Sequence, residues 1–282
     1  MAEDYTIQVV EYGRTVDQPV GVALYGAYNV GIDSMPYGFV LARNADRVVL
    51  VDAGFEAVGS GDWMRVKFHV DPYVSPVAML RSAGVEPEQV TDVIVTHAHY
   101  DHMGSLGSFP HARYYLQRQE LEKWKWALGL GPRFSAITAA CNPDDVAAAE
   151  RLVAEGRMRL LDGAVSELLP GISVDVAPNA HSYMLQFAIF ETRSFGRFIA
   201  AGDGAFSRRN FTGMNNDGAF VPQGFGVGSQ TDMVLALEKL ERLVGGEIER
   251  IIIVHEPETY AGPSVRVVNG MRIAEVCRTD AG

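Results

Sequence analysis

Cysteine is scarce in this chain of 282 residues, which contains two thiols, Cys141 and Cys277. Two cysteines so far apart in sequence provide neither a disulfide framework nor a cysteine-based metal site. Basic residues are also few, because 24 Lys and Arg face 35 Asp and Glu and give a formal net charge of -11. Binding to a phosphate backbone depends on positive charge, so we expect no nucleic-acid partner. A neutral or modestly anionic small molecule fits this composition better.

The chain also lacks long apolar runs, internal repeats and an obvious interdomain linker. The absence of a run long enough to span a bilayer predicts that the protein is not an integral membrane protein. Residues 1–5 are acidic and lack the basic start of a secretory signal, which favours a cytoplasmic location. We expect one domain over residues 1–282, with a homodimer as a possible assembly.

Short apolar segments separated by polar turns predict strands. The expected strands are 48–51, 93–95, 172–176, 184–190, 198–200 and 251–254. Helices are expected at 75–84, 118–128, 142–156 and 229–245, with Asn142 and Ser229 as capping residues. This order of elements predicts an α/β fold in which two mixed sheets are flanked by helices. The Gly-rich and Asn-rich stretch 210–228 is expected to be a long loop.

The segment Thr96–Gly104 places three histidines and one aspartate in six positions, directly after an expected strand. His97 and His99 are two residues apart on extended backbone, so their side chains point to the same side and can share one metal ion. Asp101 and His102 follow where the chain turns, and can face a second ion. Imidazole and carboxylate ligands suit zinc, and also iron, cobalt or manganese.

Three further candidate ligands follow expected strands elsewhere in the chain. His181 lies shortly after strand 172–176, and His255 directly follows strand 251–254. Asp203 follows the strand that ends at residue 200, where a carboxylate can bridge two cations. A site for two divalent cations needs ligands from several strand ends, and this shared position favours a ligand role for all three.

Asp52 ends another expected strand, where it can accept a hydrogen bond from a ligating imidazole and fix its orientation. Structural alternatives exist for each of these residues. Asp52 can be a turn carboxylate, Asp203 can belong to an Asp-Gly turn, and a lone histidine is often a core or turn residue. His69 and His111 lack the strand-end position and are interpreted as ordinary polar residues.

The order of these residues resembles the metallo-β-lactamase superfamily, and within it the N-acyl homoserine lactonase branch. The resemblance runs from residues 48–54 through the histidine motif to the end of the chain, and implies an αββα sandwich. It also implies two groups of metal ligands bridged by one carboxylate: His97, His99 and His181 for the first metal, Asp101, His102 and His255 for the second, and Asp203 between them.

Two positions depart from the lactonase pattern. Residues 178–185 lack the usual glycine before the third histidine and the histidine four residues after it. Homoserine lactonases also have a tyrosine three residues after the bridging aspartate, and this chain has Phe206 there. An acyl homoserine lactone is therefore not assigned as the substrate, and Tyr100 or Tyr183 is considered as a substitute donor beside Phe206.

The expected activity is hydrolysis of a lactone by a hydroxide that bridges two cations, with Asp101 as the group that carries a proton to the leaving oxygen. Aromatic residues in segments 28–39, 63–73 and 211–225 hint at an apolar or aromatic substrate. The same metal pair can hydrolyse a cyclic amide, a carbamate, or another ester or thioester. The alternative outside enzymes is a metal-free scaffold of the same fold.

Overall fold

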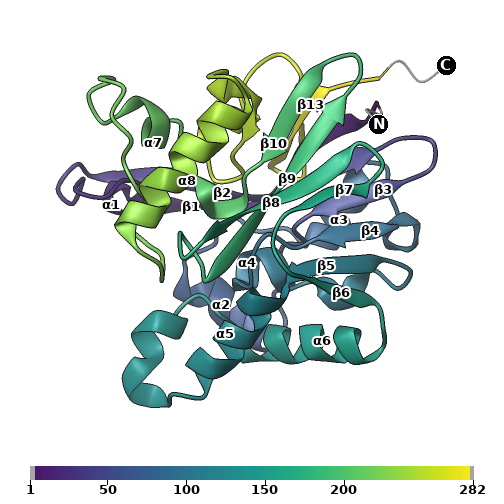
Figure 1. Ribbon diagram of the computed structural model, residues 1–282, viewed down its shortest axis with the longest axis horizontal. Coiled ribbons are helices and arrows are strands. Elements are labelled where there is room, and N and C mark those ends of the chain that lie inside the picture. Colours follow the sequence, from purple (N-terminus) through teal and green to yellow (C-terminus); the bar gives the residue numbers. More distant parts are fainter. Residues whose placement is uncertain (1–3, 280–282) are drawn as a thin grey trace.

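Two β-sheets packed face to face form the centre of the computed structural model, which describes residues 4–279 (Figure 1). The large sheet has eight strands in the order β12 (Val265–Val268), β13 (Met271–Cys277), β1 (Thr6–Pro19), β2 (Ile32–Arg43), β3 (Val48–Val51), β4 (Asp92–Ile94), β5 (Arg113–Gln117) and β6 (Met158–Leu161). The small sheet has five strands in the order β11 (Ile251–Ile252), β10 (Gly196–Ala200), β9 (Met184–Thr192), β8 (Ile172–Pro178) and β7 (Val165–Leu169). Parallel and antiparallel pairs occur in both sheets.

Helices cover the outer faces of both sheets. The large sheet is covered by α2 (Ser60–Lys67), α3 (Pro76–Ser82), α5 (Arg118–Leu128) and α6 (Pro143–Ala154), and the small sheet by α8 (Gln230–Leu243). Three short helices lie in connections: α1 (Val20–Ala23), α4 (Tyr100–Met103) and α7 (Arg209–Thr212). The result is a four-layer αββα sandwich, which confirms the predicted fold class. No helix among the described residues is both long and apolar enough to cross a membrane.

Side-chain alternation along β9 shows how the layers are held together. Phe187 and Ile189 pack in the core under α8, whereas Ala188 and Phe190 pack in the core between the two sheets. Successive side chains of a strand point to opposite faces, so this strand is buried on both sides. Strands of this kind appear in the sequence as continuous apolar runs, and 184–190 was predicted for that reason.

Local capping signals correctly predict the helix starts. The Asn142 side chain accepts a hydrogen bond from the Asp144 amide at the start of α6, and the Ser229 hydroxyl accepts one from Asp232 at the start of α8. The β1–β2 hairpin was not predicted. Its first strand carries a buried carboxylate, Glu11, and two register shifts that interrupt the alternating pattern.

Candidate metal centre

The seven candidate ligands come from strand ends of both sheets and meet at one edge of the sandwich. His97 and His99 follow β4, and α4 begins one residue later and carries Asp101 and His102. The small sheet supplies the other three: His181 from the turn between β8 and β9, Asp203 after β10, and His255 after β11. All seven side chains are buried. The structure thus brings together residues that lie up to 158 positions apart in the sequence, from 97 to 255.

A first cluster consists of His97, His99, His181 and Asp203, whose ligand atoms lie within 4.8 Å of one another. Nδ1 of His99 lies 2.9 Å from Nε2 of His97 and 3.1 Å from Nε2 of His181. Oδ2 of Asp203 lies 3.1 Å from Nε2 of His181 and 3.6 Å from Nε2 of His97. Three imidazole nitrogens and one carboxylate oxygen therefore converge on one point.

A second cluster consists of Asp101, His102 and His255. Oδ2 of Asp101 lies 3.4 Å from Nε2 of His102 and 3.5 Å from Nε2 of His255. Oδ1 of Asp203 lies 3.0 Å from His102 Nε2 and 3.2 Å from His255 Nε2. The two carboxylate oxygens of Asp203 thus face one cluster each, as a bridging ligand requires.

The residues present fit a pair of divalent cations. Ligands placed tetrahedrally at zinc distances are separated from each other by about 3.3 Å, and the distances within both clusters scatter around that value. Nε2 of His102 and Oδ1 of Asp203 are buried and lie 3.0 Å apart, but neither atom forms a hydrogen bond of acceptable geometry with any residue in 4–279. A buried polar atom without a partner is costly, and a cation would satisfy both atoms at once.

The pKa values of the histidines in the site are shifted in two opposite directions. Burial and the neighbouring His181 lower the pKa of His99 to about 3, and burial together with His102 lowers the pKa of His97 well below its usual value. Both rings are therefore neutral, as metal ligation requires. At His102, burial opposes the charged form, but the carboxylates of Asp203 and Asp101 outweigh it and raise the pKa well above its usual value.

Partners behind the cluster fix the orientation of the imidazoles. Oδ2 of Asp52 lies 2.8 Å from Nδ1 of His102, so this residue occupies the supporting position that its strand-end location suggested. The other oxygen accepts a hydrogen bond from the Thr96 amide at 2.7 Å. Asp52 has a φ of 65°, a strained conformation for a residue with a side chain, and such strain is typical of functional sites. His255 and His181 face backbone carbonyls of Pro36 and Phe225 through Nδ1.

Glu120 on α5 connects the two segments that carry the histidines of the first cluster, and it was not predicted from the sequence. Its Oε1 accepts the Ala98 amide at 2.9 Å and the Trp124 indole N–H at 2.7 Å, and also the hydroxyl of Ser182. Its Oε2 accepts the Met184 amide at 2.6 Å. The side chain is fully buried. A charged residue on the buried side of a predicted helix, four positions before Trp124, was the available signal.

Close backbone approach beside Asp203 explains one glycine of the site. Gly202 has a φ of 52°, and a Cβ atom built there would lie 2.6 Å from Oγ1 of Thr96. A side chain at this position would push the end of β10 away from the end of β4. The absence of a side chain at Gly202 therefore allows Asp203 to reach the histidines on the other sheet.

A cavity of about 120 Å³ opens onto the two clusters. Gln18, His99, Asp101, Asp203 and His255 form its polar part. The rest of its wall is mainly aromatic. Tyr37, Phe68, Phe225 and Met35 come from the three expected rim segments, whereas Tyr100, Phe206 and Val22 lie outside them. Aromatic rings thus surround the candidate metal ligands that face the cavity.

The three candidate substrate residues have different positions. Phe206 packs edge-on against His181 and His255, with ring centroids 5.2 Å and 5.0 Å apart, and therefore contacts both clusters. Tyr100 lines the cavity, and its buried hydroxyl has no hydrogen-bond partner among the described residues. Tyr183 does not line the cavity, because its ring packs on Trp124. Tyr37 is an additional hydroxyl of the wall; its segment, 28–39, was expected at the rim, but the residue itself was not named as a substrate contact.

The fold and this arrangement of ligands define a class of protein. Residues 37–165 match the metallo-β-lactamase superfamily. This matched segment contains the histidine motif, and the superfamily is the one that the motif predicted. Together with the two clusters, this supports a metal-dependent hydrolase with two divalent cations.

Several proteins of similar sequence are N-acyl homoserine lactonases. One from Bacillus sp. is 23% identical over 248 residues, which is 85% of either chain. The structure of a mutant of Bacillus thuringiensis AiiA with N-decanoyl-L-homoserine at its active site covers 92% of this chain and 95% of its own, at 19% identity and a TM-score of 0.67. AidC, a dizinc quorum-quenching lactonase, covers 100% and 97% at 14% identity and a TM-score of 0.65. The resemblance to the lactonase branch is therefore shown, at low identity.

Proposed function

We propose that this protein is a lactonase that opens the ring of an apolar or aromatic small molecule with the help of two zinc ions. One observation carries the proposal: two ligand clusters share Asp203 at the base of a cavity whose walls are aromatic. The lactonase names of the relatives support the choice of a cyclic ester. A small apolar cavity with a few convergent polar groups is typical of a small-molecule site.

The proposed ligands are His97, His99 and His181 for one ion, and Asp101, His102 and His255 for the other, with Asp203 between them. When bound, the two cations supply a nucleophile from water near neutral pH and polarise the carbonyl group of the substrate.

The chain's own residues orient the substrate and move the proton. Asp101 lies at the cavity and is the proposed group that carries a proton to the leaving oxygen of the ring. Phe206 has no hydroxyl, so the hydroxyl of Tyr100, buried in the wall and without a partner, is the proposed donor to a substrate oxygen. Phe68 and Phe225 exclude water and contact the nonpolar part of the substrate.

A screen of cyclic substrates tests the proposed reaction. Enzyme purified without added metal is expected to contain close to two equivalents of a divalent metal. It should release acid from lactones, acyl homoserine and aromatic ones included, faster than it opens cyclic amides or carbamates. Preferential opening of a cyclic amide or carbamate would replace the lactone in this proposal, and a protein that binds no metal and remains inactive after reconstitution would be the metal-free scaffold.

His102→Ala tests the site itself. Removal of this ligand should lower kcat/KM by about 100-fold or more, because the cation at the second cluster loses one ligand and Asp52 loses the imidazole that it contacts. His69→Ala is the matched control, since His69 is exposed and pairs with Asp17 at 3.3 Å. Unchanged turnover in the His102 variant, with folding intact by circular dichroism, would contradict the assignment.

A further inference from the structure

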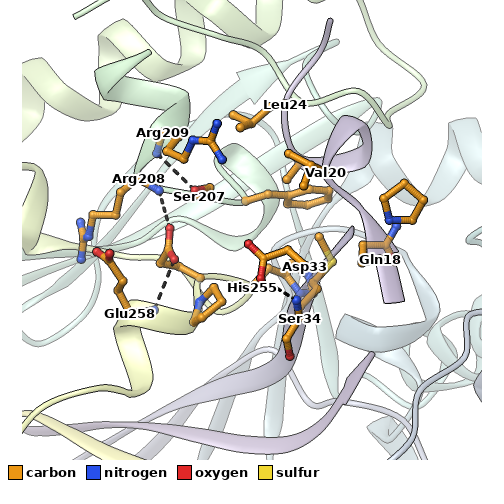
Figure 2. Close-up of a pocket in the computed structure, with 16 residues that line it drawn as sticks. Gln18, Val20, Leu24, Asp33, Ser34, Ser207, Arg208, Arg209, His255 and Glu258 are labelled. Carbon is orange, nitrogen blue, oxygen red and sulfur yellow. Dashed lines mark hydrogen bonds between the residues drawn. The ribbon is translucent and has the colours of Figure 1, made fainter. Parts of the chain in front are cut away.

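A second cavity, of about 250 Å³, adjoins the one above the metal centre (Figure 2). The two cavities share four wall residues, Gln18, Met35, Phe206 and His255. A substrate that reaches the metal centre can therefore extend past Phe206 into the second cavity. Its outer walls come from α1 and from the segment 206–209 that precedes and begins α7.

Arg209 is a half-buried cation in the wall of this second cavity. Within residues 4–279, no acceptor or acidic group pairs with its guanidinium. The hydrogen bonds of Arg209 are those of its backbone, whose amide donates to the Ser207 hydroxyl and whose carbonyl accepts the Gly213 amide. The adjacent Arg208 differs, because its guanidinium donates to the Ile248 carbonyl. In Figure 2 the side chain of Arg209 extends toward Leu24, whereas that of Arg208 points away toward Glu258.

The backbone that carries Arg209 is firmly held. The neighbouring Asn210 is fully buried, and its amide donates to the carbonyls of Ala23 at 2.9 Å and Val221 at 2.8 Å. Its Oδ1 accepts the amides of Phe206 and Ser207 at 2.9 Å and 2.8 Å. The guanidinium is thus attached to a fixed part of the wall, and a ligand does not have to order this segment of backbone on binding.

Three carboxylates also border the second cavity. Glu256 accepts the backbone amide of Arg208 at 2.6 Å through one oxygen and that of Glu258 at 3.3 Å through the other. Glu258 is exposed. Asp33, also exposed, accepts the amide of Ser34 at 2.7 Å. None of them forms an ion pair with Arg209, so its positive charge is available to a ligand.

We infer that the second cavity is a substrate subsite in which Arg209 binds an anionic group, such as a carboxylate, on the part of the substrate remote from the reacting ring. This inference rests on the proposed lactonase function and specifies its substrate class. A guanidinium pairs with a carboxylate through two parallel hydrogen bonds, and such charge-assisted bonds are stronger than neutral ones. The subsite therefore selects substrates by the charge of their tail.

Matched lactones that differ in one charge provide the test. N-Succinylhomoserine lactone and its neutral methyl ester are compared as substrates, followed by the glutaryl and adipoyl homologues to vary the reach of the tail. For at least one tail length, the enzyme should prefer the carboxylate in kcat/KM by about tenfold or more. Arg209→Gln should remove that preference, and Arg209→Lys should restore part of it. Arg133→Gln is the control, because Arg133 is exposed and lines neither cavity.

The outcomes separate this inference from the proposed function. If both lactones of every pair are opened equally well, or if Arg209→Gln retains the preference, the anionic subsite is wrong and the lactonase proposal stands. If neither lactone is opened, binding decides: chelator-treated protein, which cannot turn over, is titrated calorimetrically with N-succinylhomoserine lactone. Binding that is at least tenfold weaker in Arg209→Gln supports the subsite, and equal or absent binding overturns it.

Discussion

Asp145 shows how one side chain outside the metal centre makes stability depend on pH. It lies in the first turn of α6, where Oδ1 accepts from the Asn142 amide at 3.1 Å and the buried Oδ2 has no partner. Burial raises the pKa of this carboxyl group from 3.8 to about 7. The folded protein therefore keeps a proton that the unfolded chain releases, so stability falls as the pH rises from about 4 to about 7.

Asp145→Asn should remove this loss. The amide has nearly the shape of the carboxyl group and no charge to bury, so the variant should gain up to about 4 kcal/mol of unfolding free energy at neutral pH, with little gain at pH 4. Urea unfolding at several pH values measures the difference. Asp144→Asn, an exposed neighbour, is the control and should show no comparable pH dependence. A gain for Asp145→Asn that does not vary between pH 4 and pH 7 would refute the explanation.

At the scale of elements, α5 holds two ligand-bearing segments at a fixed separation. Glu120 accepts hydrogen bonds from the residue between His97 and His99, and from two residues that follow His181. All three histidines of the first cluster therefore depend on one carboxylate, whereas the second cluster has no contact with it. Glu120 is a positioning residue, because it acts on the cations only through these ligands.

Glu120→Gln should weaken the first metal site selectively. A glutamine side chain has one acceptor oxygen, whereas the carboxylate of Glu120 has two. The NH2 group of the glutamine would therefore face an N–H or O–H group that donates to the carboxylate in the native protein. We expect the affinity for one of the two metal equivalents to fall by about tenfold or more, with the second equivalent little changed. Competition with a chromogenic chelator measures both affinities, and Glu122→Gln on the exposed face of α5 is the control. Equal weakening of both equivalents would indicate general destabilisation instead.

The difference between ligands at strand ends and supporting residues such as Glu120 explains which parts of the site could be predicted from the sequence. The candidate ligands could be named because each lies directly or shortly after an apolar strand, and strand ends of a layered α/β fold meet at one edge. Glu120 and Tyr37 act through contacts with residues far away in the sequence, and no local pattern marks such contacts. The β1–β2 hairpin was missed because its polar Glu11 is neutralised inside the fold by Arg14 and Arg272.

At the scale of the whole molecule, the metal centre joins the two sheets. Four candidate ligands follow β4 of the large sheet and three follow strands of the small sheet. Direct polar contacts also join the sheets at this level; the buried Gln186 side-chain amide of β9 donates to the Val95 and Tyr115 carbonyls at 2.7 Å and 3.1 Å. Cations bound here would stabilise the packing of the two sheets as well as the active site.

Metal removal should therefore lower thermal stability. A ligand at 100 times its Kd adds about 2.7 kcal/mol per site to the folded state, which corresponds to a shift in Tm on the order of 5 °C or more for a chain of this size. Calorimetry of the chelated protein during stepwise return of zinc should show an increase that stops at two equivalents. In His102→Ala the increase should be smaller. A Tm that does not respond to metal would contradict this role.

The position of Phe206 has one more consequence. Its ring borders both cavities and lies against a histidine from each cluster, so one side chain contributes to the wall of the metal-centre cavity and to the wall of the cavity that contains Arg209. A smaller side chain at this position would enlarge both cavities. Substitution of Phe206 alone would therefore change which substrates fit, while every metal ligand stays unchanged.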